Sequence, residues 1–259
     1  MLLFLLSLQS FPDGPGAAGC ACGAYAWSND ASSCLSAPAG LVRITKTQFS
    51  VYSTASDLDN NNIFAAAAFE LGSQHYGAAA GLIRSESEPD TVQVALVAAR
   101  TLKGDPVGFM EGVFGPSISI GASLGFAITD EDSEDCSEML SAGLGFQFSV
   151  FPTIAIGVNV SNLRLAGDRL HERVIGYGFS TAFDRRFRGH FSVTNGKSAL
   201  GFDLAVNDWL TVRTGSDGSS WNTGVSLEHA WLKLDWAVIL NDHDCRQVLG
   251  ISVSPGGYL

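Results

Sequence analysis

A few short patterns in the sequence carry chemistry in other proteins. Residues 121–125, Gly-Ala-Ser-Leu-Gly, match the Gly-x-Ser-x-Gly pattern of hydrolases that use a nucleophilic serine. That chemistry needs a sharp turn from a strand into a helix, which exposes the serine. Here the five residues lie within an unbroken alternation of apolar and small side chains, and no helical pattern follows. We therefore expect Ser123 to be a small strand residue and not a nucleophile.

Three polar segments carry side chains that bind metal ions elsewhere. Residues 57–61 resemble the start of a calcium-binding loop, but the sixth position lacks glycine and the twelfth is Ala68 instead of Glu. Residues 130–135 are acidic and residues 242–245 read Asp-His-Asp-Cys, yet neighbours in a hairpin do not converge easily on one ion. We interpret these segments as solvated loops, with loose cation binding by 130–135 as an alternative. Because the histidines are also scattered, we predict no catalytic residue, no metal site and no cofactor.

The elements that carry these segments are strands. Between residues 117 and 129, apolar side chains occupy every second position, and the residues between them are Ser, Gly, Ala and Thr. A period of two indicates a strand with two unlike faces. The same alternation predicts about fourteen strands, at 41–54, 62–72, 74–85, 91–103, 117–129, 138–150, 153–163, 173–183, 187–194, 198–206, 209–215, 220–229, 231–240 and 246–254.

Short and longer connectors alternate between these strands. The short set includes 151–152, 184–186, 207–208 and the joint near 229–230, and the longer set includes 55–61, 86–90, 130–137, 164–172, 216–219 and 241–245. Segments 104–116 and 195–197 do not fit this alternation. Alternation puts the short turns at one end, as in an all-β, up-and-down antiparallel transmembrane β-barrel whose apolar faces meet outer-membrane lipid. The alternative is a secreted, soluble β-sandwich that packs the same faces together.

Composition favours the barrel. Charged residues are 16% of the chain, against about 25% in soluble domains, and no apolar run is long enough for a helical span. The net charge of −11 argues against a nucleic-acid partner, because phosphate binding needs clustered Lys and Arg. Aromatic residues flank the short turns, as an interfacial girdle requires: Phe151, Phe183, Phe187, Trp209 and Trp231.

The inward faces are small, polar and nearly free of charge. The few lumen charges that the strand register predicts come late in the chain: Asp203, Arg213, Glu228, Lys233 and Asp235. We expect them to pair across neighbouring strands. Since an open aqueous pore would carry more charge, the lumen should be narrow and partly filled.

The N-terminal region has a different character from the barrel, residues 41–254. Residues 1–19 begin with a short apolar run and resemble a secretory signal peptide, although no positive charge precedes Arg43. Lipidation at Cys20 is a weaker alternative, because Ala17 stands where a lipoprotein signal has a large aliphatic residue. We also consider a disulfide between Cys136 and Cys245, which both fall in expected outer loops. Residues 255–259 form a C-terminal tail.

Several weak motifs occur in a fixed order along the chain. They are Asp30-Ala31-Ser32, Pro38-Ala39-Gly40-Leu41, residues 145–163 and the motifs around 208–210 and 234–237. In this order they resemble one family, the PorV/PorQ group of FadL-like outer-membrane barrels, although Ala37 stands where the family usually has Asn. The resemblance implies a fourteen-stranded bacterial outer-membrane barrel with residues 20–40 folded inside as a hatch, or plug. The hatch residues that it implies are Asp30, Ala31, Ser32, Pro38, Ala39 and Gly40.

The resemblance also implies a non-enzymatic function. FadL-like relatives pass hydrophobic small molecules such as long-chain fatty acids across the outer membrane. The alternative is a PorV/PorQ-type component of type IX protein secretion, which docks secreted proteins at the outer surface. This chain is short for either role.

Overall fold

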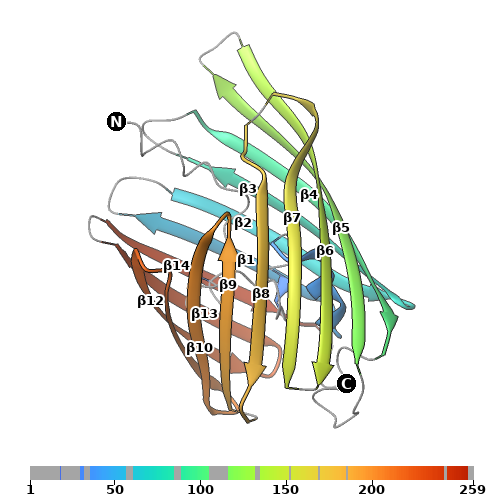
Figure 1. The fold of residues 1–259 in the computed structure, drawn as a ribbon. Coiled ribbons are helices and arrows are strands. Elements are labelled where there is room, and N and C mark those ends of the chain that lie inside the picture. The colour runs from blue at the N-terminus through green and yellow to red at the C-terminus, as the bar shows by residue number, and fades with distance from the viewer. Residues whose placement is uncertain are drawn as a thin grey trace.

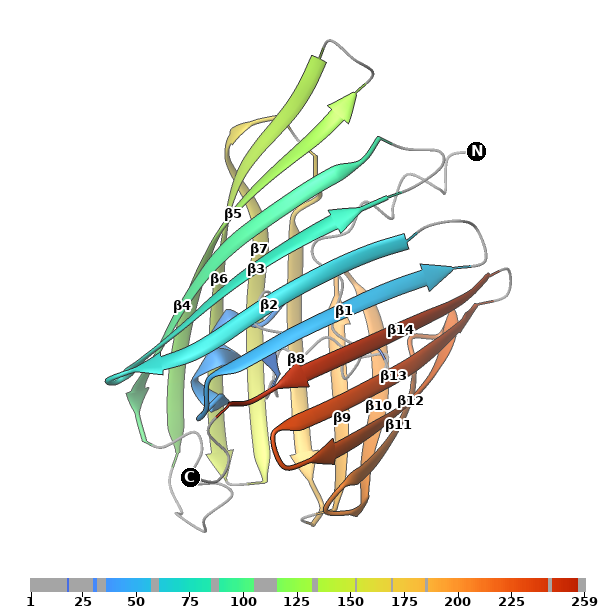
Figure 2. The same cartoon turned by 180° about the vertical axis from the view of Figure 1, so that it is seen from behind.

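The computed structural model describes residues 18, 30–31, 36–56, 61–84, 89–104, 116–131, 135–151, 153–168, 170–184, 186–241 and 244–255. Within these ranges, fourteen antiparallel strands pair in chain order, and β1 closes on β14 to complete a barrel (Figures 1 and 2). The strands are β1 (Gln48–Ser56), β2 (Asn61–Leu71), β3 (Gln74–Ile83), β4 (Thr91–Lys103), β5 (Ser117–Glu131), β6 (Asp135–Phe151), β7 (Ile154–Gly167), β8 (Val174–Ala182), β9 (Phe187–Thr194), β10 (Lys197–Asn207), β11 (Leu210–Ser216), β12 (Ser220–His229), β13 (Leu232–Asn241) and β14 (Asp244–Val253).

Most strand positions agree with the prediction from the sequence, but the first does not. A strand from residue 41 was expected, whereas β1 begins at Gln48 and the preceding residues form a 3-10 helix, η2 (Pro38–Arg43). Pro38 occupies the start of η2, where its fixed φ suits a helix and its missing N–H needs no partner. The expected long connector at 104–116 and the signal-peptide and tail segments lie almost wholly outside the described residues.

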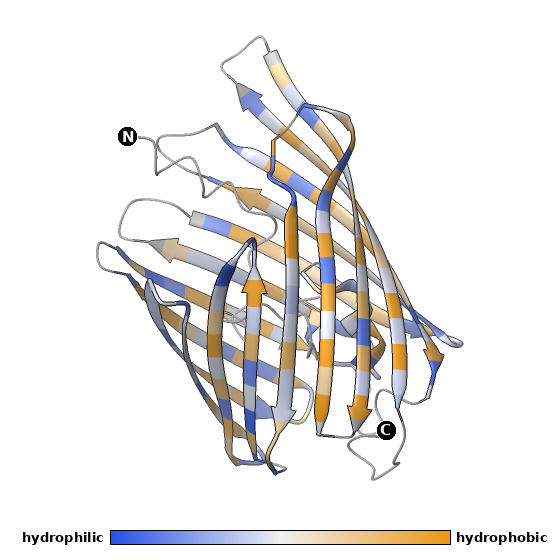
Figure 3. Cartoon of the chain, viewed as in Figure 1, coloured by the Kyte–Doolittle hydropathy of each residue, from blue (hydrophilic) through white to orange (hydrophobic). Residues whose placement is uncertain are grey.

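The strand faces point as the transmembrane interpretation requires. Ile120, Phe146 and Ile156 face outward and are 40–43% exposed, whereas the alternate residues along each strand are buried toward the lumen. Figure 3 shows the alternation of apolar and polar residues along the strands. The β-sandwich alternative is therefore wrong, because those side chains are not sealed between two sheets. No helix among the described residues has the length and apolarity to cross a bilayer.

The barrel wall is taller on one side than on the other. β5 and β6 have 15 and 17 residues, whereas β9 and β11 have 8 and 7. In Figure 1 the β5–β6 hairpin projects beyond the other strands at the end that carries the expected longer loops. The polar segment 130–137 was expected to be a loop, but its pairing continues to Glu131 and Asp135. Backbone pairing therefore extends this wall beyond its apolar band.

The short turns combine local hydrogen bonds with exposed aromatic rings. Asp184 accepts hydrogen bonds from the N–H groups of Arg186 and Phe187, both at 2.6 Å, and these bonds lower the pKa of Asp184. Phe187 stacks on Phe183 with ring centroids 5.3 Å apart. Trp209 and Trp231 are exposed at the next two turns along this rim. This aromatic belt matches the expected interfacial girdle.

The thiols at the opposite end do not pair. Cys136 at the start of β6 and Cys245 at the start of β14 are both free. The disulfide considered between them is therefore absent from this structure.

A charge placed on the outer face should test where lipid begins. We expect Leu144→Arg to destabilise the barrel by about 2–4 kcal/mol, because an exposed leucine in the apolar band would become a cation in lipid. Glu138→Arg on the same strand and face, toward the projecting end, should cost under about 1 kcal/mol. Urea unfolding in lipid vesicles measures both variants, and equal costs would contradict the membrane placement.

Candidate functional site in the barrel lumen

The helix η2 lies inside the barrel, against the inward faces of β3, β4, β5 and β6 (Figure 2). Five of its six residues are buried, from Pro38 to Val42. The three hatch residues on η2 that the resemblance implies, Pro38, Ala39 and Gly40, are all buried. We refer to η2 together with residues 30–31 and 36–37 as the lumenal segment.

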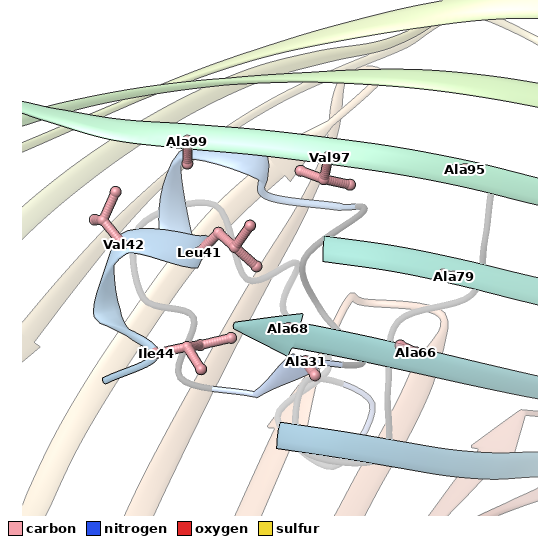
Figure 4. Close-up of a cluster of buried hydrophobic side chains, with 10 residues drawn as sticks. All are labelled: Ala31, Leu41, Val42, Ile44, Ala66, Ala68, Ala79, Ala95, Val97 and Ala99. Carbon is pink, nitrogen blue, oxygen red and sulfur yellow. The ribbon is translucent and has the colours of Figure 1, made fainter. Parts of the chain in front are cut away.

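An apolar cluster holds one side of the lumenal segment. Figure 4 shows Leu41, Val42 and Ile44 facing a wall of small side chains from β2, β3 and β4. These wall residues are Ala66, Ala68, Ala79, Ala95, Val97 and Ala99. Alanine side chains let the helix approach closely, and burial of each larger side chain contributes about 1.5–3 kcal/mol. The poly-alanine run in β2 is therefore a docking surface as well as a strand.

Two wall glycines accommodate the backbone of η2. A Cβ added to Gly121 would lie 2.4 Å from the carbonyl carbon of Pro38, and one added to Gly145 would lie 3.0 Å from the nitrogen of Ala39. No larger residue fits at Gly121 without moving the helix, because the obstructing atoms are backbone. The glycine of the Gly-x-Ser-x-Gly pattern thus serves packing, as the sequence analysis expected of this segment.

Polar contacts fix the other side of the lumenal segment. Asn159 of β7 donates to the carbonyl of Ser36 at 2.7 Å. Arg43 donates to Gln147 and Ser149 of β6 at 3.4 and 3.1 Å. Desolvation in the lumen lowers the pKa of Arg43 to about 10, and the charge of Arg188 acts in the same direction. Arg43 therefore stays charged at neutral pH while its described bonds go to neutral side chains.

A row of alternating charges crosses the wall from β9 to β13. Asp203 lies 3.5 Å from Arg188 and 3.8 Å from Arg213. Arg213 lies 3.5 Å from Asp235, and both contact the hydroxyl of Ser226. Lys233 follows, 3.0 Å from Asp235. The predicted pairing across neighbouring strands is thus present for Asp203 and Arg213, whereas Arg213 reaches Asp235 across β12 and Lys233 pairs with Asp235 within β13.

Lys233 connects this row to the lumenal segment. Its Nζ lies 2.9 Å from Asp30, and the side chains of this pair are 15% and 8% exposed. Ser50 of β1 also donates to Asp30, at 3.4 Å, and Gln48 accepts from the N–H of Ala31 at 2.7 Å. Asp30 therefore contacts both β13 and β1, where the barrel closes. Asp30 and Ala31 lie in the lumen with Pro38–Gly40, whereas Ser32 is outside the described residues.

Glu228 differs from the other predicted lumen charges. It lies opposite Lys233 in the β12–β13 register, but it is exposed and forms no ion pair within the described part of the chain. β12 ends one residue later, so this side chain reaches the rim and solvent. The sequence analysis missed Arg188 and His190, although their even positions in the strand 187–194 would have placed them on the inward face. It also did not anticipate the ionic role of Asp30.

Ser180, His190 and Asp203 form a row that resembles a hydrolase triad. His190 lies 2.7 Å from the Ser180 hydroxyl and 3.1 Å from the Asp203 carboxylate. A catalytic serine must be open to substrate, but Ser180 is 3% exposed. Asp203 is also shared with Arg188 and Arg213, which neutralise its charge. We assign the row to the structure of the wall.

The outer half of the lumen has an apolar lining. Tyr52 and Phe64 point inward from β1 and β2 and stack with centroids 5.1 Å apart. Val248, Ala237 and the partly buried Ile83 and Ile239 pack with these rings, and we call this set of side chains the aromatic cluster. Gly81 gives the Phe64 ring its space, since a Cβ there would lie 2.4 Å from the ring. Ala18 packs on the aromatic cluster, and its carbonyl accepts a hydrogen bond from Asn222 at 2.7 Å.

The fold of this chain is similar to the folds of several solved proteins. No family model and no curated protein sequence matches the chain. Among solved structures, the CymD monoaromatic hydrocarbon channel is similar with a TM-score of 0.64 and 10% identity, over 96% of this chain and 97% of that one. The P. putida toluene transporter TodX has a TM-score of 0.61 and 8% identity, over 95% of this chain and 99% of that one. The Acinetobacter baumannii outer membrane protein Omp33 has a TM-score of 0.54 and 10% identity, over 81% of this chain and 98% of that one.

These similarities and the outward apolar faces identify the fold of an outer-membrane β-barrel. The sequence prediction of fold and location is confirmed. The narrower assignment to the PorV/PorQ group has no matching family model behind it.

Substitution at Gly121 should dislodge the lumenal segment without unfolding the barrel. In Gly121→Ala, the new methyl group would meet the η2 backbone, so trypsin should cut after Arg43 faster than in the unmodified chain. The matched control is Gly125→Ala on the same strand, where the obstacle is the hydroxyl of Ser141 at 3.0 Å, a side chain that can rotate. Equal cleavage in both variants would contradict this role of Gly121.

Removal of Lys233 should cost more than removal of Asp30. Lys233→Met takes one cation from two buried carboxylates, so we expect a loss of about 3 kcal/mol in unfolding free energy. Asp30→Asn leaves Lys233 beside Asp235 and should cost about 1–2 kcal/mol. Arg84→Met breaks the exposed Arg84–Asp90 pair and should change stability by under about 0.5 kcal/mol. A denaturant titration that ranks Arg84→Met with Lys233→Met would refute this order.

Proposed function

We propose that this chain is a FadL-like barrel that passes hydrophobic small molecules across the outer membrane without chemical conversion. The aromatic cluster carries the proposal. Porins that conduct through water have polar interiors, whereas here two stacked aromatic rings and aliphatic side chains face one part of the lumen, beside the row of charges on β9 to β13. Such side chains bind apolar molecules through the hydrophobic effect and give ions and sugars no partner.

The names of the similar structures support the same class of cargo. CymD is described as a monoaromatic hydrocarbon channel and TodX as a toluene transporter. At 8–10% identity those ligands are candidates to test in this chain, beside the long-chain fatty acids that the FadL resemblance implies. The aromatic cluster favours compact apolar or aromatic cargo, because its largest side chains are the rings of Tyr52 and Phe64.

In this proposal the lumenal segment acts as a hatch that must shift before cargo passes. η2 is packed against four strands, so it obstructs the inner half of the lumen. A covalent cross-link can hold the segment in place. Asn159 of β7 donates to the carbonyl of Ser36 at 2.7 Å, so cysteines at these two positions lie within reach of a short bis-maleimide.

Uptake by intact cells tests the proposal. Cells that carry the barrel should accumulate a radiolabelled monoaromatic hydrocarbon or long-chain fatty acid faster than cells with an empty vector, while a sugar of similar mass enters equally. In Ser36→Cys/Asn159→Cys, with the native cysteines replaced by serine, a short bis-maleimide cross-link should lower uptake. Each single-cysteine variant treated with the same reagent is the control. If a folded barrel gives uptake at the empty-vector rate for every apolar probe, the proposal fails.

A second candidate is the PorV/PorQ-type role in type IX secretion. The observation that favours it is the projecting β5–β6 hairpin, which offers a paired backbone surface beyond the rest of the rim. A pull-down with the full-length barrel should then recover secreted proteins through their C-terminal domains. Loss of that recovery when the hairpin is shortened, with apolar uptake unchanged, would favour docking over transport.

A further inference from the structure

The outer face of β4 carries two cations at the end of the barrel that holds the short turns. Arg100 is exposed and lies between the outward-facing Ala98 and Leu102. Lys103 is the last residue of β4 and is also exposed. The short turn from β2 to β3 is close by, because Arg100 lies opposite Gln74, the first residue of β3. Since the short turns of such barrels face the periplasm, these cations lie on the side of the inner leaflet.

A β-bulge turns Lys103 toward lipid. In the pairing of β4 with β5, Thr101 lies opposite Ser119 and Lys103 lies opposite Ile118, so Leu102 is an extra residue. Ser119 is 2% exposed and faces the lumen, so the adjacent Ile118 faces outward, and Lys103 faces outward with it. Unbroken alternation would point Lys103 inward. The bulge therefore puts the second cation on the same face as the first, and bulges commonly re-aim a side chain in this way.

The two cations have apolar neighbours on this face. Ile118 and Ile120 flank them from β5. Phe69 of β2 is 41% exposed and stacks on Tyr76 of β3 with ring centroids 5.7 Å apart. Long basic side chains at such a position lay their methylene stems on the apolar surface and carry the charge toward the headgroups.

The described part of the chain supplies no counter-ion for this pair. Glu70 is the carboxylate of β2 to β5 that lies at this end, but it follows the inward alternation and lies opposite His75, which is 8% exposed. Neither Arg100 nor Lys103 has an ion-pair or hydrogen-bond partner among the described residues. Two like charges side by side at a lipid surface are costly unless an anion meets them.

A polar pair on β3 adds further donors. The Tyr76 hydroxyl donates to Oε1 of Gln74 at 2.5 Å, which leaves the two N–H donors of the Gln74 amide to face outward. Gln74 is exposed, and its Cβ lies about 5 Å from that of Arg100 in the strand pair. Guanidinium, ammonium and amide N–H groups all donate to phosphate oxygens. The cluster therefore suits one anionic phosphate.

We propose that Arg100, Lys103 and Gln74 bind the phosphate of an anionic phospholipid in the inner leaflet. The apolar neighbours of the cations would contact the acyl chains, which a free phosphate lacks, so a lipid fits both parts of the surface. This site anchors the β4 side of the rim, as the aromatic belt anchors the side from β8 to β13. It lies outside the lumen and does not depend on the cargo.

Lipid binding by the full-length barrel in neutral detergent tests the site. Native mass spectrometry compares phosphatidylglycerol with phosphatidylcholine of the same acyl chains, and we expect phosphatidylglycerol to be preferred. Arg100→Gln/Lys103→Gln should weaken its binding about thirtyfold, because each basic residue near an anionic headgroup contributes about a fivefold gain. Arg84→Gln/Lys197→Gln removes the same charge from exposed residues at the other end and should leave binding unchanged. Equal binding by the two double variants overturns the site.

Two further arms identify the phosphate and its source. Gln74→Glu keeps both cations but puts a carboxylate opposite Arg100, so phosphatidylglycerol binding should fall about fivefold. Unchanged binding would mean that the phosphate does not lie at Arg100, and would overturn the proposal. Inorganic phosphate in large molar excess should not displace the lipid, and displacement would overturn the lipid as the occupant. Migration in unheated gels confirms that each variant compared is a folded barrel.

Discussion

The structure depends on one constraint, which is that backbone N–H and C=O groups in a hydrocarbon environment must find partners within the protein. Closure of β1 on β14 meets that constraint around the whole circumference. It also fixes the direction of every side chain, since alternate residues must face lipid or lumen. The apolar residues go outward, so the lumen receives small residues, hydroxyls and the buried charges.

Small inward residues have a consequence beyond fitting inside a cylinder. Ala66, Ala68 and Gly121 leave enough space for a second layer, which η2 and residues 30–31 fill. The packing that soluble proteins achieve between two sheets is achieved here between a wall and a short segment of the same chain. Hydrogen bonds then fix the position of this layer, because Asn159 donates to the Ser36 carbonyl and Gln48 accepts from the Ala31 N–H, and a misplaced buried backbone group would lose its partner.

Much of this arrangement could be predicted from the sequence, and the remainder could not for physical reasons. The alternation of apolar and small residues predicted nearly all of the strands, because the two unlike faces of a strand are written in consecutive residues. It failed at residues 41–47, because apolar Leu41 and Val42 continue the apolar pattern although they pack as a helix inside the lumen. Pairing of Asp203 with Arg213 followed from the alternation of two adjacent strands, whereas the contact of Lys233 with Asp30 joins residues 203 apart and no local pattern encodes it.

Lys233 has two carboxylate neighbours of different origin. Asp235 belongs to the same strand, whereas Asp30 arrives with the N-terminal region. During assembly the wall can therefore close with this cation already neutralised, and the segment can be threaded in afterwards. Barrel closure and occupation of the interior then become separable steps in biogenesis, and the β1–β14 seam need not wait for the amino terminus.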